Sequence, residues 1–120
     1  MGVRAICGAT CLTQDDANEM TEAVVELLSG MLEKNGLTKD DLISVLFTAT
    51  PDLHCAFPAA AARHLDIGDV PLICAQELDV AGALPRVIRV MAHVESDLSR
   101  ADVKHIYLRG AEVLRQDIAQ

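Results

Sequence analysis

Five short apolar runs and a single long helical pattern constrain what this chain can fold into. Runs of four to eight apolar residues bounded by turn residues are typical of buried strands. They lie at Val3–Thr10, Leu42–Ala49, Pro71–Gln76, Val87–Val94 and Val103–Leu108. A chain of 120 residues is long enough for one core but not for two. We therefore expect one α/β (α+β) domain over residues 1–120, built on a mixed five-stranded sheet.

One long and one short helix are predicted to pack on this sheet. Thr13 followed by Asp16 resembles a capping box, and the apolar residues after it repeat at helical spacing as far as Gly36. These residues are Ala17, Met20, Val24, Leu27, Leu28 and Met31. Pro58 suits the first position of a short helix, Pro58–Leu65. Residues 109–120 form a polar tail in which we expect no regular structure and which is a candidate flexible segment.

Two such helices cannot cover both faces of a five-stranded sheet. The other face would stay exposed, and a large exposed apolar surface usually marks an interface. The alternative is a sheet that packs against copies of itself. Either way, the residues alone predict an obligate oligomer.

The stretch from Pro71 to Met91 contains two charges that need an explanation. Glu77 follows the third apolar run, and Arg89 lies in the middle of the fourth. A charge inside an apolar strand costs free energy unless a partner compensates it, so the two residues suggest a site for a small polar ligand. Two structural alternatives stay open: Glu77 is a solvated strand end, or Arg89 pairs with Glu95 or Asp97.

Strand parity limits which residues share a surface with these charges. Side chains alternate between the two faces of a strand, so Arg89 and Met91 point to the same side. Cys74 and Glu77 have opposite parity. They can line one pocket only if the strand bulges or ends near Ala75.

The other candidate residues have ordinary structural interpretations. Tyr107 alone would be an interface aromatic with its hydroxyl in water, and Cys74 alone a small core residue. The four histidines lack metal-binding spacing and the four cysteines include no C-x-x-C pair, so we expect no metal site. Residues 1–11 lack the long apolar segment of a signal peptide. We therefore interpret the cysteines as reduced thiols of a cytoplasmic protein.

The composition argues against two classes of partner. The formal net charge is −8 and aromatic residues make up 2% of the chain, whereas nucleic-acid binding needs clustered basic residues and stacking platforms. No apolar stretch approaches the roughly 20 residues that span a bilayer. We expect neither a nucleic acid nor a membrane as partner.

Motifs along nearly the whole chain make it similar to a known family. They are Arg4-Ala5-Ile6 with Gly8-Ala9-Thr10, Phe47-Thr48-Ala49-Thr50-Pro51-Asp52-Leu53-His54, Ala56-Phe57-Pro58-Ala59 with Arg63, Val70-Pro71-Leu72, Gln76-Glu77 with Asp79-Val80, Ile88-Arg89-Val90-Met91, His105-Ile106-Tyr107-Leu108 and Val113-Leu114-Arg115. Their order and spacing resemble the small monofunctional chorismate mutases of the bacterial AroH class. The resemblance implies a homotrimer with a barrel-like core of packed sheets and active sites at the subunit interfaces.

The same resemblance implies the reaction and the residues that carry it out. The reaction is the rearrangement of chorismate to prephenate in phenylalanine and tyrosine biosynthesis, which needs no cofactor. Arg89 would donate to the ether oxygen and a carboxylate, and Glu77 would bind the substrate hydroxyl with help from Cys74. Tyr107 and Arg63 would assist with a carboxylate or shape the pocket. The pocket would be lined or closed, partly from a neighbouring subunit, by Phe57, Ala59, Ile73, Leu114 and Arg115.

Two positions depart from the family pattern. Cys7 stands where the family has an arginine that binds a substrate carboxylate, and Ala60 stands where some members have a lysine near the pocket mouth. Arg4 is a poor substitute because it points to the face opposite residue 7. Two alternatives therefore stay open besides a chorismate mutase: a weakly active or non-catalytic trimer that binds a related carboxylate metabolite, and a trimeric enzyme of similar shape such as an imine deaminase.

Overall fold

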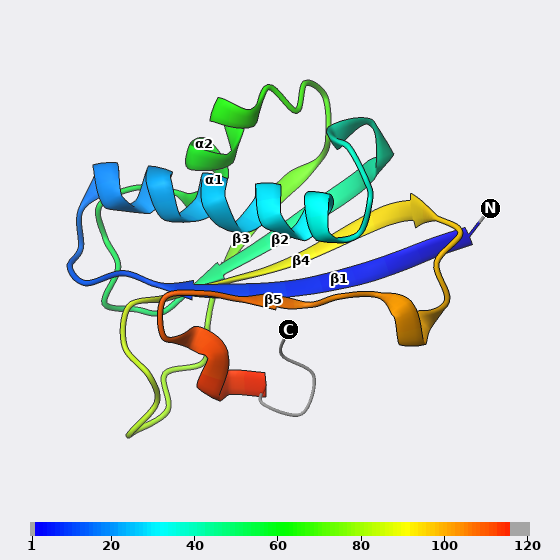
Figure 1. Ribbon diagram of the computed structural model, residues 1–120. Coiled ribbons are helices and arrows are strands. Elements are labelled where there is room, and N and C mark those ends of the chain that lie inside the picture. Colours follow the sequence, from blue (N-terminus) through cyan, green and yellow to red (C-terminus); the bar gives the residue numbers. More distant parts are fainter. Residues whose placement is uncertain (1, 116–120) are drawn as a thin grey trace.

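The computed structural model describes residues 2–115, apart from the side chain of Arg115. The elements follow in the order β1 (Gly2–Cys11), α1 (Ala17–Lys34), η1 (Lys39–Asp41), β2 (Leu42–Ala49), α2 (Pro58–Ala62), η2 (Arg63–Leu65), β3 (Leu72–Gln76), β4 (Val87–Ser96), η3 (Arg100–Asp102), β5 (Ile106–Tyr107) and η4 (Ala111–Arg115), where η denotes a 3-10 helix. The strands form one sheet in the order β3-β2-β4-β1-β5 (Figure 1). Strand β4 is antiparallel to β1 and β2, while the outer strands β3 and β5 run parallel to β2 and β1. The predicted mixed five-stranded sheet with one long and one short helix is confirmed.

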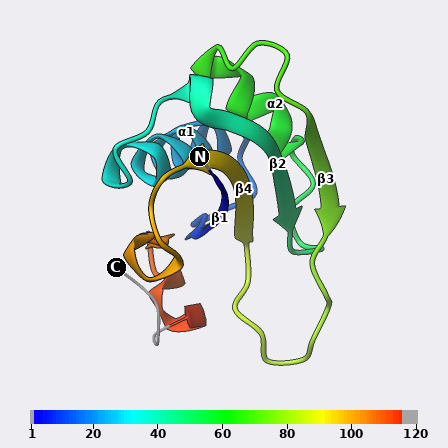
Figure 2. The same ribbon diagram turned by 90° about the vertical axis from the view of Figure 1, so that its right-hand side faces the viewer.

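The two α-helices cover one face of this sheet, as Figures 1 and 2 show from two directions. Helix α1 lies over β1 and β5, and α2 lies over β2 and β3. Ala17, which the helical spacing also placed on the apolar stripe of α1, is exposed at the first position of the helix. The rest of the predicted stripe is buried against the sheet: Met20, Val24, Leu27, Leu28 and Met31. No described helix is both long and apolar enough to cross a membrane.

Close packing of α1 on β1 depends on Gly8. A Cβ atom at this position would lie 2.6 Å from Sδ of Met31 and 3.1 Å from the carbonyl oxygen of Ile106. Both distances are shorter than an ordinary van der Waals contact, so only a residue without a side chain lets α1 and β5 approach β1 this closely.

Neither α-helix covers the opposite face of the sheet, and in residues 2–115 the 3-10 helix η4 covers it only at one edge, where Ala111 and Leu114 pack against Ala9 and Tyr107. Arg89 and Met91 point to this open face, whereas Val90 is buried on the helical side, as parity predicted. Ile73 on the edge strand β3 keeps 63% of its surface exposed. The expectation of an uncovered, partly apolar sheet face therefore holds for the single chain outside the edge under η4.

Helix α1 begins one turn later than the capping pattern predicted. The N-cap is Asp16, whose side chain accepts a hydrogen bond from the backbone N–H of Glu19 at 2.8 Å. Thr13 instead donates through its own N–H to the Glu19 carboxylate at 2.7 Å. A start at Thr13 would conflict with Asp15, whose carboxylate is used by the distant loop at His54.

The C-terminal segment is more ordered than predicted. Strand β5 spans only Ile106–Tyr107, shorter than the expected Val103–Leu108, but residues 111–115 form the 3-10 helix η4. A turn with positive φ at Arg109 (53°) and Gly110 (94°) redirects the chain between them. The expectation of irregular structure is thus wrong for residues 111–115, and residues 116–120 lie outside the described part of the chain.

Candidate active site

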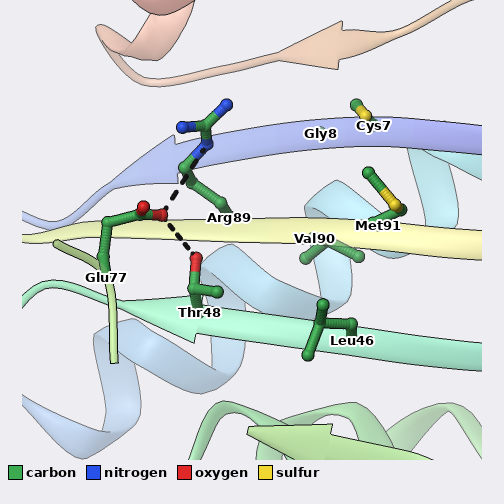
Figure 3. A pocket seen from close by; sticks show the side chains of 8 residues that line it. All are labelled: Cys7, Gly8, Leu46, Thr48, Glu77, Arg89, Val90 and Met91. Carbon is green, nitrogen blue, oxygen red and sulfur yellow. Dashed lines mark hydrogen bonds and ion pairs between the residues drawn. The ribbon is translucent and has the colours of Figure 1, made fainter. Parts of the chain in front are cut away.

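A cavity of about 210 Å³ lies on the open face, over the middle strands of the sheet. Its lining comes from β1, β2, β4 and the end of β3 (Figure 3): Cys7, Gly8, Leu46, Thr48, Glu77, Arg89, Val90 and Met91. Figure 3 shows the charged pair Glu77 and Arg89 at one end and the side chains of Cys7 and Met91 at the other. The cavity therefore combines one cation and one anion with an apolar wall.

The register of the sheet explains why these residues meet. Residues directly opposite each other on paired strands point to the same face. Arg89 is opposite Ala9 of β1 and Thr48 of β2, and Met91 is opposite Cys7. Two adjacent rows of side chains across the sheet thus build the cavity, and Cys7 is one of the residues that line it.

Glu77 reaches the cavity from the end of β3. Its backbone N–H donates to the carbonyl oxygen of Ala49 at 2.9 Å, which continues the pairing with β2 one residue beyond the strand. The hydroxyl of Thr48 donates to Oε2 of Glu77 at 2.7 Å. Nε of Arg89 lies 3.9 Å from the same oxygen. Glu77 is therefore not a solvated strand end.

The ion pair between Glu77 and Arg89 is loose and partly hydrated. The side chains keep 27% and 37% of their surface exposed, and 3.9 Å is too long for a hydrogen bond. A pair of this kind adds little stability, and the guanidinium keeps donors for an anionic ligand. Arg89 therefore pairs with Glu77 and not, as the structural alternative had it, with Glu95 or Asp97. Glu95 lies six residues, about 20 Å, further along β4, and Asp97 lies beyond the end of that strand.

A second hollow of about 220 Å³ borders the other side of the charged pair. Glu77, Arg89 and Leu114 line it together with residues of the β3–β4 loop. Tyr107 lies beside it, because it pairs with Ala9 in the same row as Arg89 and packs near Leu114. Tyr107 is 2% exposed, so the expectation of a water-exposed aromatic is wrong for the single chain.

Cys74 does not join Glu77 in either hollow. Strand β3 is regular up to Gln76, with Cys74 opposite Phe47 on the helical side and no bulge at Ala75. Cys74 instead lines a separate hollow with Phe57, whose side chain is 73% exposed. The parity conflict seen in the sequence is thus resolved by keeping Cys74 and Glu77 on opposite faces.

Helix α2 and the turn after it also lie on the helical side of the sheet, away from the cavity of the same chain. Ala59 is partly buried against the core, while Ala60 and Arg63 are exposed to solvent. Ile73 shares the open face but is absent from the cavity lining. Arg115 belongs to η4 by its backbone, and its side chain lies outside the described residues.

The loop that precedes Phe57 is held by Asp15. The Asp15 carboxylate accepts hydrogen bonds from the backbone N–H groups of His54 and Cys55, each at 3.0 Å. Hydrogen bonds, first that of the Cys55 thiol, lower the pKa of Asp15. Burial, followed by the contact with Asp15, raises the pKa of Cys55 to about 11. This thiol is therefore protonated at neutral pH and acts as a structural donor.

Known proteins resemble this chain along nearly its full length. The family profile of chorismate mutase type I matches residues 3–118. The chain belongs to the chorismate mutase type I family. Two curated relatives are named chorismate mutase AroH: one from Bacillus subtilis is 40% identical over 99% of this chain and 94% of its own, and one from Thermus thermophilus is 46% identical over 97% and 96%. A solved chorismate mutase from Clostridium thermocellum has 48% identity and a TM-score of 0.89, covering 92% of this chain and 98% of its own.

Family membership confirms the resemblance and the isomerase class predicted from the motifs. Five residues that line the cavity of this type I chorismate mutase were not singled out as site residues from the sequence: Gly8, Leu46, Thr48, Val90 and Met91. Of these, Thr48 contacts the charged pair. Thr48 lies in the matching motif around Pro51 but carries no charge, so nothing in its own residue type marked it. Only its pairing with Arg89 and its contact with Glu77 reveal its position.

Proposed function

We propose that this chorismate mutase rearranges chorismate to prephenate in the cavity formed around Arg89 and Glu77. The observation that carries the proposal is the pairing of one guanidinium with one carboxylate, 3.9 Å apart, in a cavity with apolar walls. The family supplies the reaction, and the charged pair supplies the chemistry that this reaction needs.

The rearrangement is unimolecular, so it requires no nucleophile, metal or general base. One carbon–oxygen bond of the ether breaks while one carbon–carbon bond forms, and no proton changes place. The protein has to hold the substrate in its folded conformer and stabilise the negative charge that develops on the ether oxygen. A million-fold acceleration corresponds to roughly 8 kcal/mol of transition-state stabilisation.

Arg89 is suited to the electrostatic part of this task. Its guanidinium is always charged and has several donors in one plane, and its ion pair with Glu77 is too long to occupy them. In our proposal Arg89 donates to the ether oxygen and to one carboxylate, and Glu77 accepts a hydrogen bond from the substrate hydroxyl. In the proposal the bound substrate displaces water from the apolar walls at Leu46 and Met91, which strengthens these interactions.

A homotrimer with sites at the subunit interfaces belongs to the same proposal. It is supported by the uncovered sheet face, because exposed apolar surface such as that of Ile73 favours an interface. It is also supported by the expected pocket residues that do not line the cavity of their own chain, which a neighbouring subunit would have to contribute: Phe57, Ala59, Ala60, Arg63, Ile73 and Cys74. A cytoplasmic location remains part of the proposal.

The alternative is a weakly active or non-catalytic trimer that binds a related carboxylate. The observation that favours it is Cys7, which lines the cavity with a neutral thiol-bearing side chain where the family pattern has a carboxylate-binding arginine.

Purified protein incubated with chorismate tests the proposal directly. We expect prephenate to form faster than in the protein-free thermal reaction, and Arg89→Ala to remove this acceleration. An unaccelerated reaction at high protein concentration would favour the non-catalytic alternative. Analytical ultracentrifugation of the same sample would give the mass of three chains, and a monomer would contradict the trimer.

A further inference from the structure

Thr48 lies in the middle of β2 on the open face, directly opposite Arg89 of β4 and Ala75 of β3. Glu77 follows Ala75 by two residues, so it is the diagonal neighbour of Thr48 on the same face. Diagonal neighbours are about 7–8 Å apart, within reach of a long side chain. Figure 3 shows the result: the Thr48 hydroxyl donates to Oε2 of Glu77 at 2.7 Å.

Both contacts of the Glu77 carboxylate with the described side chains use the same oxygen. Thr48 donates to Oε2, and Nε of Arg89 is closest to Oε2 as well. A carboxylate held through one oxygen can no longer rotate freely about its terminal bond. Oε1 is therefore the oxygen that remains to accept a hydrogen bond from a ligand.

When an anionic ligand binds, we expect Glu77 to lose its contact with Arg89 and to keep its hydrogen bond with Thr48. The Arg89 contact is 3.9 Å long and competes with any anion that binds the guanidinium. The Thr48 hydrogen bond has the length of a charge-assisted O–H···O⁻ contact, and its single uncharged donor is already used by Glu77. Once an anionic substrate engages Arg89, the Thr48 hydroxyl is the contact that continues to hold the carboxylate.

We propose that Thr48 is a positioning residue that orients Glu77 for the substrate hydroxyl. This inference rests on the proposed function, in which Glu77 accepts that hydroxyl. Threonine suits the role because its β-branched side chain has few rotamers in a strand, so its hydroxyl has a fixed direction. Thr48 acts through Glu77 and does not itself have to touch the reacting atoms.

The substitution Thr48→Val tests the proposal because it keeps the shape and removes only the hydroxyl. We expect KM for chorismate to rise about tenfold, the factor of one charge-assisted hydrogen bond in a partly exposed site. We expect kcat to change by less than about twofold, because Arg89 still stabilises the transition state. Thr48→Ser retains the hydroxyl and should restore KM to within about threefold of the wild type.

A modified substrate separates positioning from a merely structural effect. With a chorismate derivative whose hydroxyl is methylated, Thr48→Val should not change the KM of the enzyme, because this derivative has no hydroxyl that could donate a hydrogen bond to Glu77. Thr10→Val makes the same chemical change on the helical side of the same sheet and should leave KM unchanged for both compounds.

Three results would overturn the assignment of Thr48. They are an unchanged KM for chorismate in Thr48→Val, an equal rise with both substrates, or no recovery in Thr48→Ser. Failure of the proposed function would look different, since the wild type itself would then not accelerate the rearrangement.

Discussion

The substitution Cys7→Arg would add a second cation to the cavity, at the position where the family pattern has a carboxylate-binding arginine. Cys7 is two residues along β1 from Ala9, the partner of Arg89, so the two positions lie about 7 Å apart on the same face. A guanidinium about 4 Å from a substrate carboxylate gains roughly 4 kcal/mol at an effective dielectric constant of 20. Desolvation of the two groups removes about half of this gain. The remaining ~2 kcal/mol corresponds to about 30-fold tighter binding.

The new arginine would also repel Arg89. At about 7 Å the repulsion is roughly 2 kcal/mol at the same dielectric constant. Because it acts with and without ligand, it lowers the free energy of unfolding and leaves the affinity unaffected. We therefore expect a less stable protein with a higher kcat/KM, the gain appearing mainly as a lower KM.

The assay follows the loss of chorismate absorbance at several substrate concentrations. Ala5→Arg is the matched control, because it adds the same charge on the same strand and face one row further from Arg89, opposite His93. It should give no gain, since its guanidinium starts about 14 Å away from the Arg89 position, beyond the Debye length. If Cys7→Arg leaves kcat/KM unchanged while Arg89→Ala abolishes activity, residue 7 does not meet the carboxylate. Equal gains from both arginines would mean that net charge alone acts.

Three further predictions concern stability and reactivity. Gly8→Ala should lower the free energy of unfolding by about 1–3 kcal/mol, because its Cβ would overlap Met31; an unchanged urea midpoint would show that α1 shifts without cost. Thr10→Val should raise the free energy of unfolding by about 1 kcal/mol, since the buried Thr10 hydroxyl has no hydrogen-bond partner among the described residues. A lower free energy of unfolding in this variant would contradict that reasoning. The pKa of Cys55 is raised to about 11, so labelling of its peptide by a thiol reagent, measured by mass spectrometry, should still accelerate above pH 9. A rate that levels off below pH 9 would contradict the effect of burial and Asp15.

The secondary structure could be predicted well where the pattern is local. The strand Leu42–Ala49 has the predicted bounds, and the apolar stripe of α1 is buried apart from Ala17. The start of α1 was predicted one turn too early, because Thr13 and Asp16 have the spacing of a capping box, whereas in the structure Asp16 caps the helix and Thr13 donates to the Glu19 carboxylate. Residues 111–115 looked irregular because their helical turn depends on the positive φ at Arg109 and Gly110.

Some residues of the candidate site could likewise be predicted from the sequence, and others could not. Glu77 and Arg89 could be found from the sequence, because a charge next to or within an apolar run is costly wherever the run packs. Thr48 could not, because a threonine in a strand is unremarkable until the register places it opposite Arg89. Cys74 was grouped with Glu77 through the family resemblance, and the regular end of β3 keeps the two on opposite faces of this chain.

The sequence by itself determined the fold class and the family, and it identified Glu77 and Arg89 as candidate site residues. These conclusions follow from periodicity, motif order and the cost of burying charge. Tertiary structure alone decided which strands are neighbours and in which register, and hence which side chains face the cavity. A shift of two residues between β2 and β4 would keep every side chain on its face but separate Thr48 from Arg89, and the alternation within each strand does not exclude that shift. The register is set by the packing of the whole sheet under α1 and α2, and the site follows from it.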